Sequence, residues 1–214
     1  MKFGLIICAL FTVPGRSGAA NDLVAEIRPG IFKIGQVELN KTNKVISFPA
    51  AVNMTQGNVE YLLVTESGKV HESVFRTAIE PSHLQVAKLL LDSNRVDGQT
   101  NLPQDLRGPS VLLWVNWQKD GVSQKAAAES FVVNTQEKAV MKPGPWVFNG
   151  SRIVNGTFIA QRDGSIVTIQ TDIDALINNP RAGRENDDIW LVNSNAVPTV
   201  GTVVQVNIQF LSKP

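Results

Sequence analysis

The sequence predicts an α+β fold rich in β-structure, with a mainly antiparallel sheet and two or three short helices. The first observation is residues 204–210, where apolar and polar side chains alternate as in a strand whose sheet has one solvated face. The second is the recurrence of short apolar segments between glycine, proline and asparagine turns. The third is that few segments have helical periodicity, so strands should dominate the core.

Residues 1–20 are typical of a secretory signal peptide. Lys2 precedes an apolar segment over residues 3–13, and the small residues that follow permit cleavage after Ala19 or Ala20. The only cysteine, Cys8, lies inside the apolar segment, so cleavage would remove every thiol and with it any disulfide or cysteine-ligated metal. We therefore expect the mature protein to be periplasmic or secreted.

The remaining residues, 21–214, are expected to form a single domain. This length is sufficient for one hydrophobic core of ordinary size. A candidate internal boundary lies near residues 138–145, which contain Pro143 and Pro145 but are too short for a flexible linker.

The charge balance of the mature chain excludes two classes of partner. Without Lys2 and Arg16 the 20 basic residues become 18, against 19 acidic residues, so the formal charge is −1. Such a balance favours neither nucleic acid nor an anionic membrane surface. No apolar segment after residue 20 approaches the ~18 residues that a membrane span requires. The expected mature protein is soluble, and its partner is an unknown envelope protein or a small ligand.

The remaining elements follow from local patterns. A strand over residues 45–48 should end at Pro49, and residues 111–117 alternate cleanly. Two hairpins are expected, one joining residues 59–65 to 70–75 and one joining 157–160 to 166–170 around Gly164. Helices are expected over residues 82–91, 126–132 and 172–177, the first with a capping box between Ser82 and Gln85.

The first hairpin carries the clearest candidate site, because His71, Glu72 and Ser73 follow its glycine turn. With Gly68 in the left-handed position of a three-residue loop, Tyr61 faces Ser73, and Glu60 is the diagonal neighbour of Glu72. Two carboxylates on an otherwise apolar face would raise the pKa of one of them, which is how a general acid is made. The same arrangement also occurs where an ordinary sheet edge meets solvent.

His83, the second histidine, lies in the first turn of the helix expected over residues 82–91. No histidine, cysteine or carboxylate follows one turn later, which favours a packed or solvated histidine over a metal ligand. The sequence therefore predicts no metal site and no cofactor. A metal held jointly by His71 and His83 is the alternative.

Several stretches resemble the YdjY-domain family of exported bacterial proteins: VNMTQGNVEYLLVTESGKVHESVF, PWVFNGS, GTFIAQRDGSIVTI, DALINNP and VPTVGTVVQV. Together they cover nearly all of the mature chain, and the H-E-S and W-V-F-x-G-S segments are the most specific. The resemblance implies no particular activity. Some relatives carry a cysteine-rich, ferredoxin-like part that this chain lacks, so no electron-transfer role is expected.

The function expected from the sequence is that of an exported, soluble binding or accessory module of the bacterial cell envelope. The alternative is a hydrolase that uses Glu72 or His71, with or without a metal. The candidate ligand-binding residues are Glu60, His71, Glu72, Ser73, Trp146 and Ser151. Trp146 has a second interpretation, because large aromatic side chains in strands usually belong to the core.

Overall fold

The computed structural model describes residues 23–91 and 101–212. The expected signal peptide, residues 1–20, lies outside the described residues. No helix in these two ranges is long and apolar enough to cross a membrane.

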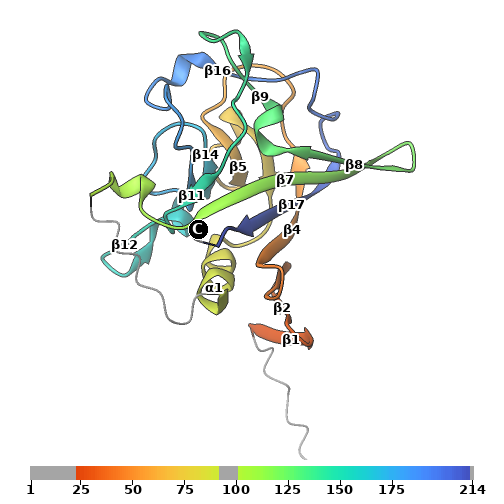
Figure 1. Ribbon diagram of the computed structural model, residues 1–214, viewed down its shortest axis with the longest axis vertical. Coiled ribbons are helices and arrows are strands. Elements are labelled where there is room, and N and C mark those ends of the chain that lie inside the picture. The colour runs from red at the N-terminus through yellow and green to blue at the C-terminus, as the bar shows by residue number, and fades with distance from the viewer. Residues whose placement is uncertain (1–22, 92–100, 213–214) are drawn as a thin grey trace, which may run out of the picture.

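Eight strands form a closed ring in the centre of the molecule (Figure 1). Around the ring they are β4 (Val45–Val52), β17 (Val203–Phe210), β7 (Ser110–Lys119), β11 (Trp146–Phe148), β15 (Ile177–Asn178), β14 (Ser165–Thr168), β5 (Tyr61–Thr65) and β6 (Ser73–Thr77). The ring closes where β6 returns to β4. All its pairings are antiparallel except β14 with β15 and β5 with β6. The prediction of a β-rich, mainly antiparallel fold is confirmed, but the α+β class did not anticipate a barrel.

The other strands extend or flank this barrel. A meander of β1 (Val24–Arg28), β2 (Ile31–Ile34) and β3 (Val37–Asn40) continues the sheet from β4, and β8 (Val122–Ala127) pairs with β7. A small sheet contains β9 (Val132–Asn134), β10 (Ala139–Val140) and β16 (Trp190–Val192), and β12 (Ile153–Val154) pairs with β13 (Thr157–Phe158). Barrel strands therefore come from both sides of residues 138–145, where the sequence suggested a boundary.

Two α-helices occur in the described part of the chain, α1 (Pro81–Leu91) and α2 (Ile159–Asp163). Four 3₁₀ turns are also present: η1 (Val70–Glu72), η2 (Gln104–Leu106), η3 (Ala128–Phe131) and η4 (Asp187–Ile189). The expected helix at 82–91 is confirmed as α1, which lies at one end of the barrel (Figure 1). Its expected capping box is not formed, because the Ser82 backbone N–H donates to Gln161 Oε1 at 3.1 Å.

The barrel core confirms the strands expected at residues 204–210 and 111–117, which lie in β17 and β7. On β17, Val204, Val206, Ile208 and Phe210 are buried and Gln205 is exposed, as the alternation predicted. Asn207, which was expected on the solvated face, is instead buried, where its Oδ1 accepts the Ser47 hydroxyl at 2.8 Å and its Nδ2 donates to the Gln205 carbonyl at 3.1 Å. The prediction that the strand at 45–48 ends at Pro49 is wrong, because β4 continues to Val52. Along one edge of β4 the partner changes from β3 to β6 near Pro49, so a residue without an N–H is tolerated there.

The expected hairpin of residues 59–65 with 70–75 is wrong. Tyr61 does pair with Ser73, but β5 and β6 are parallel, and η1 occupies the start of the expected second strand. A connection as short as residues 66–72 normally joins antiparallel strands, since parallel neighbours usually need about a dozen residues or more. Closure of the barrel overrides that local preference.

Three further expectations are wrong for related reasons. Residues 126–132 pair along β7 and then turn through η3 rather than forming a helix, because tertiary pairing outweighs the helix propensity of three alanines. In the expected helix at 172–177, the Asp172 side chain accepts the Asp174 N–H at 2.8 Å, a local bond that competes with helix formation. The hairpin around Gly164 is instead α2 followed by β14, which pairs with β5 and β15.

Gly164 gives a stability prediction with a matched control. It ends α2 in the left-handed region at φ +72°, and a Cβ there would overlap Thr65 Oγ1 and lie 2.8 Å from the Gly68 Cα. Gly156 has a similar φ of +79° with open space around it. We expect Gly164→Ala to destabilise the protein by about 1–3 kcal/mol more than Gly156→Ala, because only the former adds overpacking to the backbone cost. Equal losses in urea unfolding would contradict this contact.

Candidate functional site

A polar cleft of about 580 Å³ opens where three segments meet: the connection from β5 to η1, helix α2, and the loop between β14 and β15. We call it the polar cleft. Its lining residues are Tyr61, Ser67, Gly68, Lys69, His71, Arg162, Asp163, Ser165, Gln170, Thr171, Asp172 and Asp174. The volume lies in the range of small-molecule sites in proteins.

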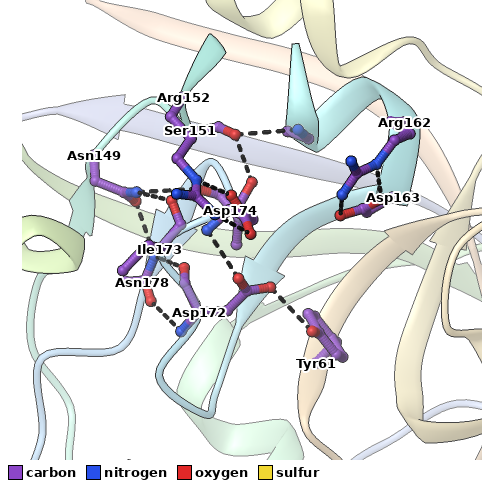
Figure 2. Close-up of polar contacts among 12 residues, drawn as sticks. Tyr61, Asn149, Ser151, Arg152, Arg162, Asp163, Asp172, Ile173, Asp174 and Asn178 are labelled. Atoms are coloured by element: carbon purple, nitrogen blue, oxygen red, sulfur yellow. Dashed lines mark hydrogen bonds and ion pairs between the residues drawn. The ribbon is translucent and has the colours of Figure 1, made fainter. Parts of the chain in front are cut away.

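Asp172 is a half-buried carboxylate of this lining that accepts two hydrogen bonds from neutral donors (Figure 2). Its Oδ2 accepts the Tyr61 hydroxyl at 3.0 Å, and its Oδ1 accepts the Asp174 N–H at 2.8 Å. Its own backbone N–H donates to Asn178 Oδ1 at 3.1 Å. Burial, followed by the negative charge of Asp172, raises the pKa of Tyr61 well above its ordinary value, so the phenol remains a donor.

Two asparagines, the buried Asn178 and the half-buried Asn149, bond the loop that carries Asp172. Asn178 Nδ2 donates to the Asp172 carbonyl at 2.8 Å and to Asn149 Oδ1 at 2.9 Å (Figure 2). Asn149 Nδ2 in turn donates to the Ala175 carbonyl at 3.0 Å. These bonds replace regular secondary structure in the loop and fix its backbone.

Lys69 lies on another side of the cleft, with a carboxylate cluster behind it. Its Nζ is 3.1 Å from Glu72 Oε1 and 3.4 Å from Glu60 Oε2, and it lies 5.2 Å from the centroid of the Tyr61 ring. Partial desolvation lowers the pKa of Lys69, but the bond to Glu72 and the surrounding negative charge outweigh it and raise the pKa overall. Lys69 is therefore a permanent cation at neutral pH.

Two arginine–aspartate pairs complete the charged groups around the cleft (Figure 2). Arg162 holds Asp163 through two bonds of 2.6 and 2.8 Å, and Arg152 holds Asp174 through bonds of 2.5 and 3.2 Å. Each is a bidentate pair, in which the guanidinium matches the planar carboxylate. In both pairs the arginine charge is compensated within the protein.

The structure separates the six residues expected to bind ligand. His71 lines the cleft with a side chain that is 77% exposed. Glu60 and Glu72 are not part of the lining, but both contact Lys69, which is. Ser73 is fully buried on β6, where its hydroxyl donates to the Phe75 carbonyl at 2.8 Å.

Trp146 and Ser151 have structural surroundings. Trp146 is fully buried and donates its indole N–H to Glu129 Oε1 at 2.8 Å. Ser151 donates to the Asp174 carbonyl at 2.5 Å and accepts the Ala160 N–H at 3.1 Å, so it joins the Asp174 loop to α2.

His83 lies away from His71, against the turn between β2 and β3. A Cβ at Gly35 would come within 2.6 Å of His83 Nδ1, and His83 Nε2 is 3.7 Å from Glu80 Oε2. The two histidines therefore have different neighbours. In the described ranges, no three histidine, cysteine or acidic side chains converge as a metal site would require.

The pair Glu60 and Glu72 gives a pH prediction. Burial, then repulsion from Glu72, raises the pKa of Glu60 above 4.5, with Lys69 opposing the shift. The stability linked to this group is therefore complete below pH 4.5 and is lost as the pH rises through the higher folded-state pKa. The quantity to measure is the melting temperature of Glu60→Gln minus that of the wild type. We expect this difference to be about 1–2 °C larger at pH 7 than at pH 4.

Glu66→Gln provides the control for that measurement, because Glu66 is an exposed carboxylate that follows β5, whereas Glu60 precedes it. Its melting temperature relative to the wild type should change less between the two pH values. If the difference in melting temperature between Glu60→Gln and the wild type is the same at pH 4 and pH 7, the pKa of Glu60 is not raised.

These features define the class of protein: a closed β-barrel that carries a polar cleft. The family model described as YdjY domain matches residues 37–209. This chain therefore belongs to the YdjY-domain family. No curated protein and no solved structure matches it.

Sequence reasoning found His71 but missed most of the cleft. Tyr61, Lys69, Arg162, Asp172 and Asp174 lie on three segments whose approach depends on the barrel. One local signal was available: Asp172, Asp174, Asn178 and Asn179 concentrate groups that bond loop backbones, which argues against the helix expected at 172–177.

Proposed function

We propose that this protein is an exported binding module of the bacterial cell envelope and that its polar cleft holds a small polar ligand. The observation that carries the proposal is the fixed position of Asp172 between the Tyr61 hydroxyl and the Asp174 N–H, on the lining of the cleft. A binding group that is already positioned loses little entropy when a ligand arrives.

Export is supported by the charged, apolar and small-residue parts of residues 1–20. In a bacterial host the mature N-terminus should be Ala20 or Asn21. Mass spectrometry that finds Met1 on the protein from the cell envelope would contradict export by cleavage.

The hydrolase alternative depends on His71 and Glu72. The His71 Nε2 lies 3.7 Å from Glu72 Oε2, which is beyond hydrogen-bonding distance, and Glu72 is ion-paired with Lys69 at 3.1 Å. A general base needs an orienting partner within hydrogen-bond reach. The arrangement therefore favours binding over hydrolysis.

A cleft-filling variant tests the binding proposal without assuming the ligand. Thr171 is exposed on the lining, so Thr171→Trp should fill the cleft, whereas Thr135→Trp places the same side chain at an exposed position outside it. We expect at least one of a panel of amines, amino acids, short peptides, sugars and organic acids to raise the melting temperature of the wild type. A ligand at about 100 times its Kd adds about 2.7 kcal/mol of stability.

The stabilisation should persist in Thr135→Trp and disappear in Thr171→Trp. Stabilisation that survives in both variants would place the ligand elsewhere. A panel in which no compound binds at millimolar concentration would contradict the proposal.

A further inference from the structure

We propose that the polar cleft recognises a primary ammonium group through Asp172; this rests on the proposed function and names its ligand class. Asp172 accepts only neutral donors, the Tyr61 hydroxyl and the Asp174 N–H. Among the described residues it is in no ion pair, although it lines the cleft. Its charge acts on Arg152 at longer range, but that guanidinium bonds Asp174, so no cation bonds Asp172 directly.

The cations around the cleft are already compensated. Arg162 is paired with Asp163, Arg152 with Asp174, and Lys69 with Glu72 and Glu60. These three cations face five carboxylates when Asp172 is included, so the formal charge of the group is −2 with His71 neutral. A field of this sign attracts a cation and repels phosphate or carboxylate ligands.

The geometry favours an ammonium group over a metal ion. No third carboxylate or histidine joins Asp172 in a metal-binding arrangement within the described residues. An ammonium requires only a few acceptors, and an ionised carboxylate offers about four lone-pair positions, two of which are used here. The Tyr61 ring, which already lies 5.2 Å from the Lys69 ammonium, adds an aromatic surface that tolerates cations.

The ammonium group has two natural sources, a free amine or the amino terminus of a peptide. Gln170 and Thr171, next to Asp172 on the lining, add amide and hydroxyl groups that can bond the amides of a peptide. Both sources present the same ammonium group. Calorimetry separates them with three probes, which are ethanolamine, trialanine amide, and trialanine amide acetylated at its amino group.

At least one ammonium probe should bind the wild type, and acetylation should weaken the peptide by about tenfold or more. If ethanolamine binds as tightly as trialanine amide, a free amine suffices; if only the peptide amide binds, the peptide source is assigned. The variant Asp172→Asn keeps one acceptor oxygen for the Asp174 N–H and replaces the other oxygen by an amide nitrogen, which can donate to the Tyr61 hydroxyl. It loses the charge, so it should weaken the ammonium probes by about tenfold or more. Asp187→Asn, an equal change of charge at an exposed residue of η4, should leave them unchanged.

Equal affinity for the acetylated and free peptides, or unchanged binding by Asp172→Asn, would overturn the ammonium assignment. If all three probes fail but a neutral disaccharide binds the wild type and not Thr171→Trp, the ligand class is wrong while the cleft remains a binding site. If no compound of the wider panel binds either, both proposals fall. Binding of calcium that Asp172→Asn abolishes would replace the ammonium by a metal.

Discussion

Replacing Trp146 by alanine is expected to lower the free energy of unfolding by about 3–5 kcal/mol, the cost of deleting a fully buried indole. The loss has a polar component as well. Trp146 donates to Glu129 at 2.8 Å, and Arg181 both pairs with Glu129 at 2.8 Å and lies 5.0 Å from the centroid of the indole ring. Burial lowers the pKa of Arg181 and Glu129 opposes that shift, so the three groups depend on one another.

Two further variants separate these components in urea unfolding. Trp146→Phe keeps an aromatic ring but removes the donor to Glu129, and should cost about 1–3 kcal/mol. Trp114→Ala removes an indole that is only half-buried and is stacked with Lys125, so it should cost clearly less than Trp146→Ala. Equal losses for Trp114→Ala and Trp146→Ala would show that Trp146 is not a core residue.

Asn178→Ala is expected to be the second most damaging change, at about 2–4 kcal/mol. The Asn178 side chain is fully buried and makes three hydrogen bonds, to Asn149 Oδ1, to the Asp172 carbonyl and from the Asp172 N–H. Each such bond contributes about 0.5–1.5 kcal/mol, and the partners left buried cost more. The same change should weaken ligand binding, because it releases the loop that positions Asp172.

Asn186→Ala is the matched control. Its side chain accepts the Asp188 N–H at 3.0 Å at the start of η4, and that turn is outside the cleft lining. It should cost about 1 kcal/mol and leave binding intact. If Asn178→Ala unfolds at the same urea concentration as the wild type, the loop does not depend on these bonds.

The sequence predicted the elements whose side chains alternate over several residues. Strand β17 and the central part of β7 were predicted because apolar and polar residues alternate along each, and α1 because Ser82 and Gln85 have the spacing of a helix start. Such patterns record burial directly. They do not depend on knowing the neighbouring strand.

The expectations that failed concern short segments whose conformation is set by distant partners. Residues 66–72 turn through η1 so that β5 and β6 can run parallel, and residues 126–132 follow β7. Gly164 was expected to turn a hairpin but ends α2, because a glycine in the left-handed region ends a helix as readily as it turns a hairpin. Local chemistry alone does not distinguish these outcomes.

The site was partly predictable for the same reason. His71 and Glu72 were chosen because adjacent ionisable groups follow a glycine turn, and Glu60 because it was the expected diagonal neighbour of Glu72. The structure places His71 on the cleft lining and both glutamates within 3.4 Å of Lys69. Asp172 was missed because its role depends on the approach of Tyr61, which is 111 positions away in the sequence.

The most direct test of the central claim is a map of backbone amide chemical shifts recorded while a compound that stabilises the protein is added. The largest changes should fall on Lys69, His71, Thr171 and Asp172, which line the polar cleft. Changes centred on the apolar groove between α1 and the β12–β13 hairpin, at Val86, Ile153 and Phe158, would contradict the claim and would move the binding site to the other side of α2.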